Sequence, residues 1–191
     1  RVMLRSSGSS ATAAVVGTGV NGRAAAAAFV AVGREPLLWD VDAERARAAA
    51  AATGGRVAKS LAEALAADLV VTVTPGREIL FAEGSLRAGQ HVSLMGADGP
   101  GKAEIAVGEL ARIRLFCDDW EQASHGGELA AAVDAGRIGR GVSRAGRQRN
   151  GRKCGKSQRL SIERHRCLLI LSIVAWPAVA IPSAVGPRLV P

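Results

Sequence analysis

Three glycines near the start of the chain have the spacing of a phosphate-binding loop. Residues 13–16 are small or β-branched and apolar, which predicts a buried strand, and residues 23–32 are a run of good helix formers. Between them lies a G-x-G-x-x-G pattern made of Gly17, Thr18, Gly19, Val20, Asn21 and Gly22. A strand, this pattern and a helix in that order predict a dinucleotide-binding site formed by all six residues; a purely structural glycine turn is the alternative.

Each glycine of the pattern has a physical role in such a site. Gly17 permits the tight turn from strand to helix, Gly19 lets a pyrophosphate approach the backbone, and Gly22 lets the helix pack closely on the sheet. The start of the helix then presents unpaired N–H groups to the phosphates.

An acidic residue follows at the distance that a ribose-binding carboxylate requires. Residues 37–39 predict a second strand, which ends at Asp40, about 20 residues beyond the glycine pattern. A carboxylate there would hold both ribose hydroxyls, which favours NAD over NADP as the cofactor. Asp42 is the rival acid, but we expect it to cap the next helix. Arg45 could reach the 2′-phosphate of NADP, although a helix-surface arginine is the simpler interpretation.

Strands and helices alternate along residues 13–136. The apolar pattern predicts strands at residues 13–16, 37–39, around 57, 68–73, 91–95 and 113–117. Helices are expected at residues 23–32, 43–52, 60 to about 67, 104–111 and 127–135. Ser60 and Glu63 form a capping box at the start of the third helix. The alternation is typical of an α/β protein with a Rossmann-type, doubly wound parallel sheet, so we predict a flexible lead-in at 1–12 and one dinucleotide-binding domain at 13–136.

Several predicted strands end at residues that could contact a ligand. The strand ends that should gather at the carboxyl edge of the sheet, where such folds bind ligands, are Gly17, Asp40, Thr74, Gly96 and Asp118. Thr74-Pro75 and Met95-Gly96 would lie beside the nicotinamide half of the cofactor. For Thr74 the alternative is simple turn initiation before Pro75.

The charges are divided unevenly along the chain. Residues 1–136 hold 13 basic and 16 acidic side chains, whereas residues 137–191 hold 12 basic side chains and one acid, Glu163. The predicted domain therefore has no nucleic-acid signature. Three cysteines without metal spacing favour a reducing, cytoplasmic location. His91 and His125 have no ligand partner at a suitable spacing, so we expect no metal site.

The sequence changes character after residue 136. Residues 137–166 are rich in arginine and glycine, and residues 167–185 are uncharged and mostly apolar, with Pro177 and Pro182 inside them. We expect an irregular basic and then apolar C-terminal tail. Its interpretations are a shifted reading frame or a disordered tail, a weakly membrane-associating tail, and a packed segment.

The segment after the fifth predicted strand resembles a family signature. Residues 95–105, MGADGPGKAEI, are similar to the G-[AG]-D-x-P-G-K-x-E-[LI] signature of the ornithine cyclodeaminase/μ-crystallin family. Further similar segments follow the family order: Gly17-Thr18-Gly19-Val20, Thr72-Val73-Thr74-Pro75, Asp119-Trp120-Glu121-Gln122-Ala123 and Gly127-Glu128-Leu129. The resemblance covers residues 13–136. Members bind NAD or NADP and act on amino acids or cyclic imines.

The resemblance implies roles for two residues of the signature. Asp98 takes the place of the family's catalytic aspartate, an acid/base for the proton at the substrate nitrogen. Lys102 takes the place of a residue that lies beside the cofactor. The alternatives are an Asx turn for Asp98 and a solvated loop position for Lys102.

The resemblance also implies a function. The first hypothesis is an NAD-dependent ornithine cyclodeaminase, which converts L-ornithine into L-proline and ammonia by internal hydride transfer. The second is an amino-acid dehydrogenase or ketimine reductase of the same family. The third is a catalytically inactive NAD-binding fragment or a membrane-attached binding module.

The sequence departs from the family pattern in two places. Asn21 stands where the family usually has Gln, and Gly22 stands where it has another small residue. The resemblance implies an N-terminal segment that forms the dimer and supplies the Arg and Lys of a substrate clamp, and we expect this chain to lack that segment. The resemblance implies a homodimer, which we do not expect without that segment.

Overall fold

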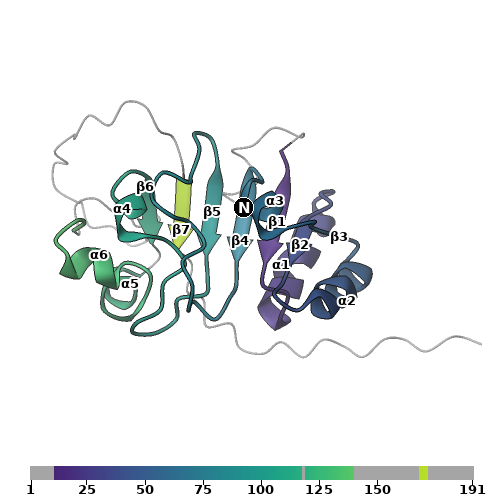
Figure 1. Ribbon diagram of the computed structural model, residues 1–191, viewed down its shortest axis with the longest axis horizontal. Coiled ribbons are helices and arrows are strands. Elements are labelled where there is room, and N and C mark those ends of the chain that lie inside the picture. Colours follow the sequence, from purple (N-terminus) through teal and green to yellow (C-terminus); the bar gives the residue numbers. More distant parts are fainter. Residues whose placement is uncertain (1–10, 118, 140–167, 172–191) are drawn as a thin grey trace, which may run out of the picture.

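The computed structural model describes residues 11–117, 119–139 and 168–171. They form a seven-stranded sheet with the order β3-β2-β1-β4-β5-β7-β6, in which all neighbouring strands are parallel (Figure 1). The prediction of an α/β fold with a doubly wound parallel sheet is confirmed. The chain leaves β1 in one direction through β2 and β3 and then returns to β4 on its other side. The carboxyl ends of β1 and β4 therefore flank the switch point at which such sheets bind ligands.

The first half of the fold consists of four strands and three helices. They are β1 (Ala13–Val16), α1 (Val20–Ala31), β2 (Leu37–Trp39), α2 (Ala43–Thr53), β3 (Arg56–Val57), α3 (Leu61–Leu65) and β4 (Leu69–Thr72). The second half consists of β5 (His91–Leu94), α4 (Val107–Leu110), β6 (Arg114–Cys117), α5 (Trp120–Gly126), α6 (Ala130–Asp134) and β7 (Leu168–Leu171).

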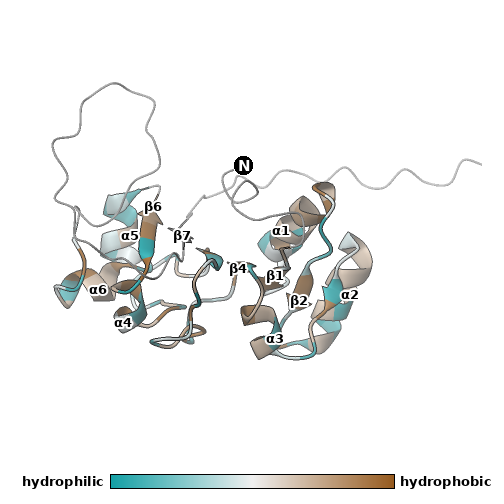
Figure 2. Cartoon of the chain, turned by 90° about the horizontal axis from the view of Figure 1, so that it is seen from above, coloured by the Kyte–Doolittle hydropathy of each residue, from teal (hydrophilic) through white to brown (hydrophobic). Residues whose placement is uncertain are grey.

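The sheet separates two apolar clusters. Ala13 and Val15 of β1 face a cluster that includes Ala26 of α1 and Ala49 of α2. The intervening residues of β1 face the larger cluster, to which α3, α4, α5 and α6 contribute. Figure 2 shows α1 and α3 on opposite sides of the sheet. Because β1 is buried on both faces, its four residues are all apolar, as is typical of a central parallel strand.

Local signals in the sequence set several helix ends. Asp42 caps α2 by accepting hydrogen bonds from the N–H groups of Glu44 and Arg45, and Gly54 ends the helix in the left-handed conformation. Only half of the predicted capping box forms at α3. The Glu63 N–H donates to Ser60 Oγ at 3.2 Å, but the Glu63 carboxylate accepts from the Lys59 N–H at 2.5 Å instead of from Ser60.

Three helices in the second half of the fold differ from the expectations. The helix predicted for residues 104–111 is limited to α4, because the backbone before it pairs with another segment: the Glu104 carbonyl accepts from the Leu80 and Phe81 N–H groups, and the Ala106 N–H donates to the Phe81 carbonyl. The helix predicted for 127–135 is shorter and begins at Ala130, while α5 precedes it. Asp119 caps α5 by accepting from the Gln122 N–H at 3.2 Å.

A short strand comes from the basic and then apolar stretch. Residues 168–171 form β7, which pairs in parallel with β5 on one side and with β6 on the other. The rest of that stretch beyond residue 139, and with it the membrane interpretation of 167–185, lies outside the described residues. Within the described part of the chain, no helix is long and apolar enough to cross a membrane.

His91 makes the stability of the fold depend on pH. Its side chain is buried at the start of β5, and neither ring nitrogen has a hydrogen-bond partner among the described residues. Burial lowers the pKa of His91 from 6.5 to about 4. Between pH 6.5 and about 4 the His91 side chain is therefore protonated in the unfolded chain and neutral in the folded chain. His91 thus lowers the free energy of unfolding as the pH falls through this range.

We expect His91→Leu to remove this cost. Its free energy of unfolding, relative to that of the unsubstituted chain, should rise by about 3 kcal/mol as the pH falls from 7 to 4. Urea unfolding at several pH values measures this difference. A difference that does not change with pH would show that His91 is not held neutral in the folded chain.

Candidate functional site

Three loops meet where the strands end at the carboxyl edge. A Cβ atom on Gly17 would lie 2.6 Å from the carbonyl oxygen of Val73, so only glycine allows this approach of the β1 loop to the β4 loop. The φ of Gly17 is +91°, which also favours glycine. A Cβ on Gly76 would lie 3.0 Å from the carbonyl oxygen of Gly96. The loops after β1, β4 and β5 are therefore packed side by side at the switch point.

The glycine pattern forms the turn into α1 as predicted, although the helix begins at Val20, three residues earlier than expected. A Cβ on Gly22 would overlap the carbonyl oxygen of Gly17, which explains the need for glycine where α1 packs on β1. Gly19, by contrast, has open space around its Cβ position and is the N-cap of α1 without a side-chain cap hydrogen bond. Val20 and Asn21 are exposed beside it. This helix end can accept an anion at its N–H groups.

Asp40 is held against the glycine loop. Its Oδ2 accepts hydrogen bonds from the Thr18 N–H at 2.7 Å and from Thr18 Oγ1 at 2.9 Å, and its Oδ1 accepts from the Asp42 N–H at 3.0 Å. Partial burial opposes ionisation, but these hydrogen bonds outweigh it, and the pKa of Asp40 lies below its ordinary value. The carboxylate is thus ionised and fixed at the end of β2. The Thr18 side chain is buried and committed to Asp40, so it can act on a ligand only through that acid.

A buried carboxylate connects the ends of β4 and β5. Glu104 Oε1 accepts from the Thr74 N–H at 3.2 Å and from Thr74 Oγ1 at 2.5 Å. Glu104 Oε2 accepts from Thr72 Oγ1 at 2.5 Å and from the Gly96 N–H at 3.0 Å. This cluster is not predicted from the sequence, because the pattern of residues 104–111 indicates a helix that includes Glu104. The signal that could have revealed it is the Thr72–Thr74 spacing, because residues two apart share one face of a strand.

A second buried carboxylate supports the first. Glu128 Oε1 accepts from the N–H groups of Glu104 and Ile105 at 2.7 and 2.8 Å. Glu128 Oε2 is buried and has no partner among the described residues. Burial, with a smaller contribution from the nearby Glu104 charge, raises the pKa of Glu128 to about 7.

This raised pKa predicts a pH effect opposite to that of His91. Between the ordinary value of 4.5 and about 7, the folded chain holds a proton on Glu128 that the unfolded chain has lost. Glu128 therefore costs stability as the pH rises through this window, by about 3 kcal/mol at most. We expect Glu128→Gln to gain stability relative to the unsubstituted chain as the pH rises from 4.5 to 8, measured by urea unfolding. A constant difference between the two proteins would contradict the assignment.

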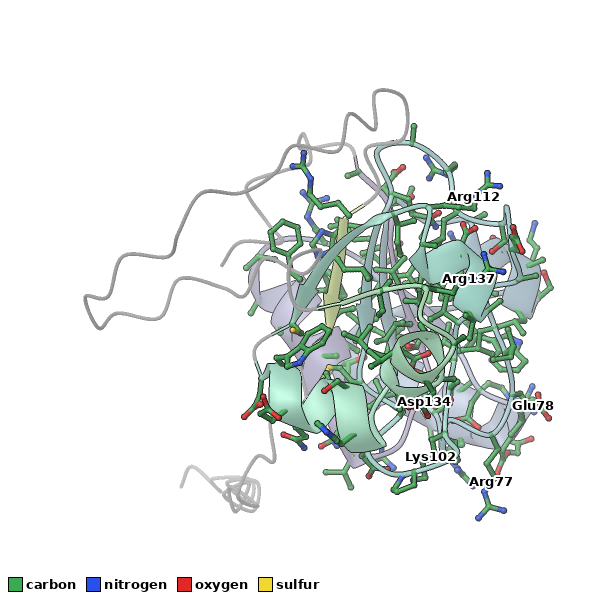
Figure 3. All side chains as sticks on the ribbon, turned by 90° about the vertical axis from the view of Figure 1, so that its left-hand side faces the viewer. Arg77, Glu78, Lys102, Arg112, Asp134 and Arg137 are labelled. Carbon is green, nitrogen blue, oxygen red and sulfur yellow. The ribbon has the colours of Figure 1, made fainter. Side chains whose placement is uncertain are left out.

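Asp98 and Lys102 form an ion pair in the loop after β5. The Asp98 side chain is 62% exposed and that of Lys102 is 33% exposed. The hydrogen bond from Lys102 holds the pKa of Asp98 below its ordinary value. Asp98 is therefore an accessible carboxylate that can accept a proton. Figure 3 shows Lys102 at the same end of the molecule as Arg77, with Arg112 towards the other end.

The other predicted residues lie on the same three loops. Pro75 is exposed beside Thr74, and Met95 packs partly against the apolar cluster under α1 while Gly96 is buried. A Cβ on Gly96 would overlap Glu104 and the carbonyl oxygen of Thr74. Asp118 lies outside the described residues. Within residues 11–117, 119–139 and 168–171, no group of three or more His, Cys, Asp or Glu side chains could hold a metal ion.

Comparison with known proteins shows where this arrangement occurs. The sequence model of the ornithine cyclodeaminase/mu-crystallin family matches residues 4–159. The chain belongs to that family. The resemblance stated from the signature of residues 95–105 is thereby confirmed.

Two curated relatives of the chain are named as dehydrogenases. An alanine dehydrogenase of Archaeoglobus fulgidus is 44% identical over 77 residues, which are 40% of this chain and 24% of that protein. A putative dehydrogenase of Rhizobium meliloti is 36% identical over 135 residues, which are 66% of this chain and 41% of that protein. The chain thus spans less than half the length of these curated relatives.

Solved structures of similar proteins share the fold. An archaeal alanine dehydrogenase dimer with bound NAD is 26% identical, with a TM-score of 0.68 over 86% of this chain and 52% of that chain. The iminosuccinate reductase of Paracoccus denitrificans in complex with NAD⁺ is also 26% identical, with a TM-score of 0.62 over 71% of this chain and 44% of that chain.

Proposed function

We propose that the three loops at the carboxyl edge bind NAD. The diphosphate lies on the N–H groups at the start of α1, above Gly19, where no side chain occupies the approach. Asp40 holds the adenosine ribose, because its ionised carboxylate sits at the end of β2 beside Thr18. The packing of the β1, β4 and β5 loops at the switch point carries this proposal. The two solved relatives that contain NAD support it.

The residues of the β4 and β5 loops are assigned to the reactive half of the cofactor. The nicotinamide is bordered by Thr74, Pro75, Met95 and Gly96. Lys102 lies at the same carboxyl edge of the sheet. When bound, the nicotinamide supplies the hydride acceptor or donor for the α carbon of the substrate. Asp98 is the acid/base for the proton at the substrate nitrogen. The ion pair with Lys102 keeps its carboxylate ionised and thus able to accept that proton.

The substrate class that fits this chemistry is an amino acid or a cyclic imine. Our first candidate reaction is the conversion of L-ornithine into L-proline and ammonia, in which the hydride leaves the α carbon and returns to the cyclic imine. The second is net oxidation of an amino acid or reduction of an imine. The 44% identity to an alanine dehydrogenase favours this second reaction.

An assay of cofactor and product together distinguishes these reactions. The chain is incubated with NAD and either L-ornithine or L-alanine, and absorbance at the NADH band is followed while proline and ammonia are measured. A cyclodeaminase forms proline and ammonia without net NADH, whereas a dehydrogenase accumulates NADH. A chain that binds NADH but forms neither proline with ammonia nor net NADH in this assay would support the third hypothesis, a catalytically inactive binding domain.

A further inference from the structure

Glu104 has a hydrogen-bond environment that no other described carboxylate has. It is fully buried and accepts four hydrogen bonds, two from backbone N–H groups and two from threonine hydroxyls. A carboxylate offers about four lone-pair sites, so this one side chain can accept from all four donors. Its partners, Thr72, Thr74 and Gly96, lie at the ends of two neighbouring strands.

The cluster determines the position of two site loops at once. Thr74 Oγ1 also accepts from the Gly76 N–H at 3.1 Å, so the hydroxyl that binds Glu104 also fixes the turn after β4. The Gly96 N–H, held by Glu104 Oε2, comes two residues before Asp98. Glu128 in turn fixes the backbone of Glu104 through its hydrogen bonds to the N–H groups of residues 104 and 105.

We propose that Glu104 is a positioning residue for the reactive half of the cofactor. It does not touch the cofactor, because its side chain has no exposed surface. It acts by holding the Thr74 and Gly96 loops, and with them the Asp98 loop, at a fixed distance from the glycine loop. This inference rests on the proposed NAD site. It requires that loss of Glu104 affect the nicotinamide half of the site and spare the adenosine half, which is held by Asp40 and α1.

Glu104→Gln tests the inference with almost no change in shape. A carboxamide has one acceptor oxygen, so its NH₂ group must face one of the two backbone N–H donors, that of Thr74 or that of Gly96, and the loop of that residue loses its anchor. Two ligands are titrated against the chain: NADH, and ADP-ribose, which lacks the nicotinamide. We expect the variant to bind NADH about tenfold more weakly and ADP-ribose within about twofold of the unsubstituted chain.

Glu109→Gln is the matched control. Glu109 is also a buried glutamate that accepts two backbone hydrogen bonds, from the N–H groups of Gly84 and Leu86, at 2.6 and 2.9 Å. The two residues that it holds lie in the same connection between β4 and β5 as Thr74, but eight or more positions beyond Gly76, and neither is assigned to the cofactor. The ratio of the two affinities should therefore remain that of the unsubstituted chain in Glu109→Gln and change in Glu104→Gln.

Thr72→Val decides the question if Glu104→Gln does not fold. Thr72 is buried within β4, and valine keeps its backbone hydrogen bond to Met95 but removes the hydroxyl that donates to Glu104, so selective weakening of NADH binding is again the expected result. Equal loss of both ligands, or no loss of either, overturns the positioning role while leaving the NAD site in place. Failure of the unsubstituted chain to bind either ligand overturns the proposed function and this inference together.

Discussion

We expect Gly19→Val to lower the affinity for NADH at least about 100-fold while the chain stays folded. The reason is the open space at this position: a side chain on Gly19 meets no atom of the described chain, so the folded structure accommodates it. The same side chain fills the approach of a diphosphate to the first turn of α1. The loss of a glycine N-cap costs about 1 kcal/mol of stability at most. Fluorescence titration with NADH and urea unfolding measure the two effects.

Two further glycine variants act as controls for this result. Gly139→Val adds the same side chain at another open position, outside the three loops, and should bind NADH normally. Gly22→Val should unfold or strongly destabilise the chain, because its Cβ would overlap the carbonyl oxygen of Gly17. Normal NADH binding by Gly19→Val would show that the glycine pattern is only a structural turn.

The second large effect is expected at Asp98. Asp98→Asn should reduce turnover about a hundredfold or more, because an amide cannot accept the proton at the substrate nitrogen. Its affinity for NADH should not change, since the side chain lies in the loop beyond Gly96 and not on the glycine loop. The measurements are kcat for the substrate identified by the product assay and the dissociation constant for NADH.

Two further variants, at Lys102 and at the exposed Asp134, test the role of Asp98 from other sides. Lys102→Met removes the hydrogen bond that lowers the pKa of Asp98, so the acidic limb of the pH–rate profile should move to higher pH. Asp134→Asn changes an exposed carboxylate at the end of α6 and should leave turnover unchanged. Full turnover by Asp98→Asn would remove Asp98 from the mechanism and leave its loop with a structural role.

The fold could be predicted from the sequence where local signals and burial agree. Continuous apolar runs between turn residues fixed β1, β2 and β4, and the Asp42 cap fixed the start of α2. The segment after Lys102 could not be predicted in this way. Residues 104–111 have helical propensity. The start of this segment is instead held by hydrogen bonds to other segments: the Glu104 carboxylate accepts from the ends of β4 and β5, and the Glu128 carboxylate accepts from the N–H groups of Glu104 and Ile105. Such contacts, between residues 8 to 32 positions apart, leave no periodic pattern in the sequence.

The sequence motifs of the candidate site could be predicted, but the hydrogen bonds and the ion pair that hold its loops in place could not. The glycine pattern and Asp40 have fixed spacing because a backbone turn and a ribose impose it, so they could be recognised from one sequence. The Glu104 cluster depends on which strand ends become neighbours, and the parallel order of β4 and β5 decides this. The ion pair of Asp98 with Lys102 also depends on the path of a loop, which residue types alone do not determine.

The most direct test of the account is a crystal structure of the chain soaked with NADH. We predict the diphosphate within about 3 Å of the N–H groups at the start of α1, with the ribose on Asp40 and the nicotinamide facing the Asp98 loop. A dinucleotide bound elsewhere, or none bound at saturating NADH, would contradict it.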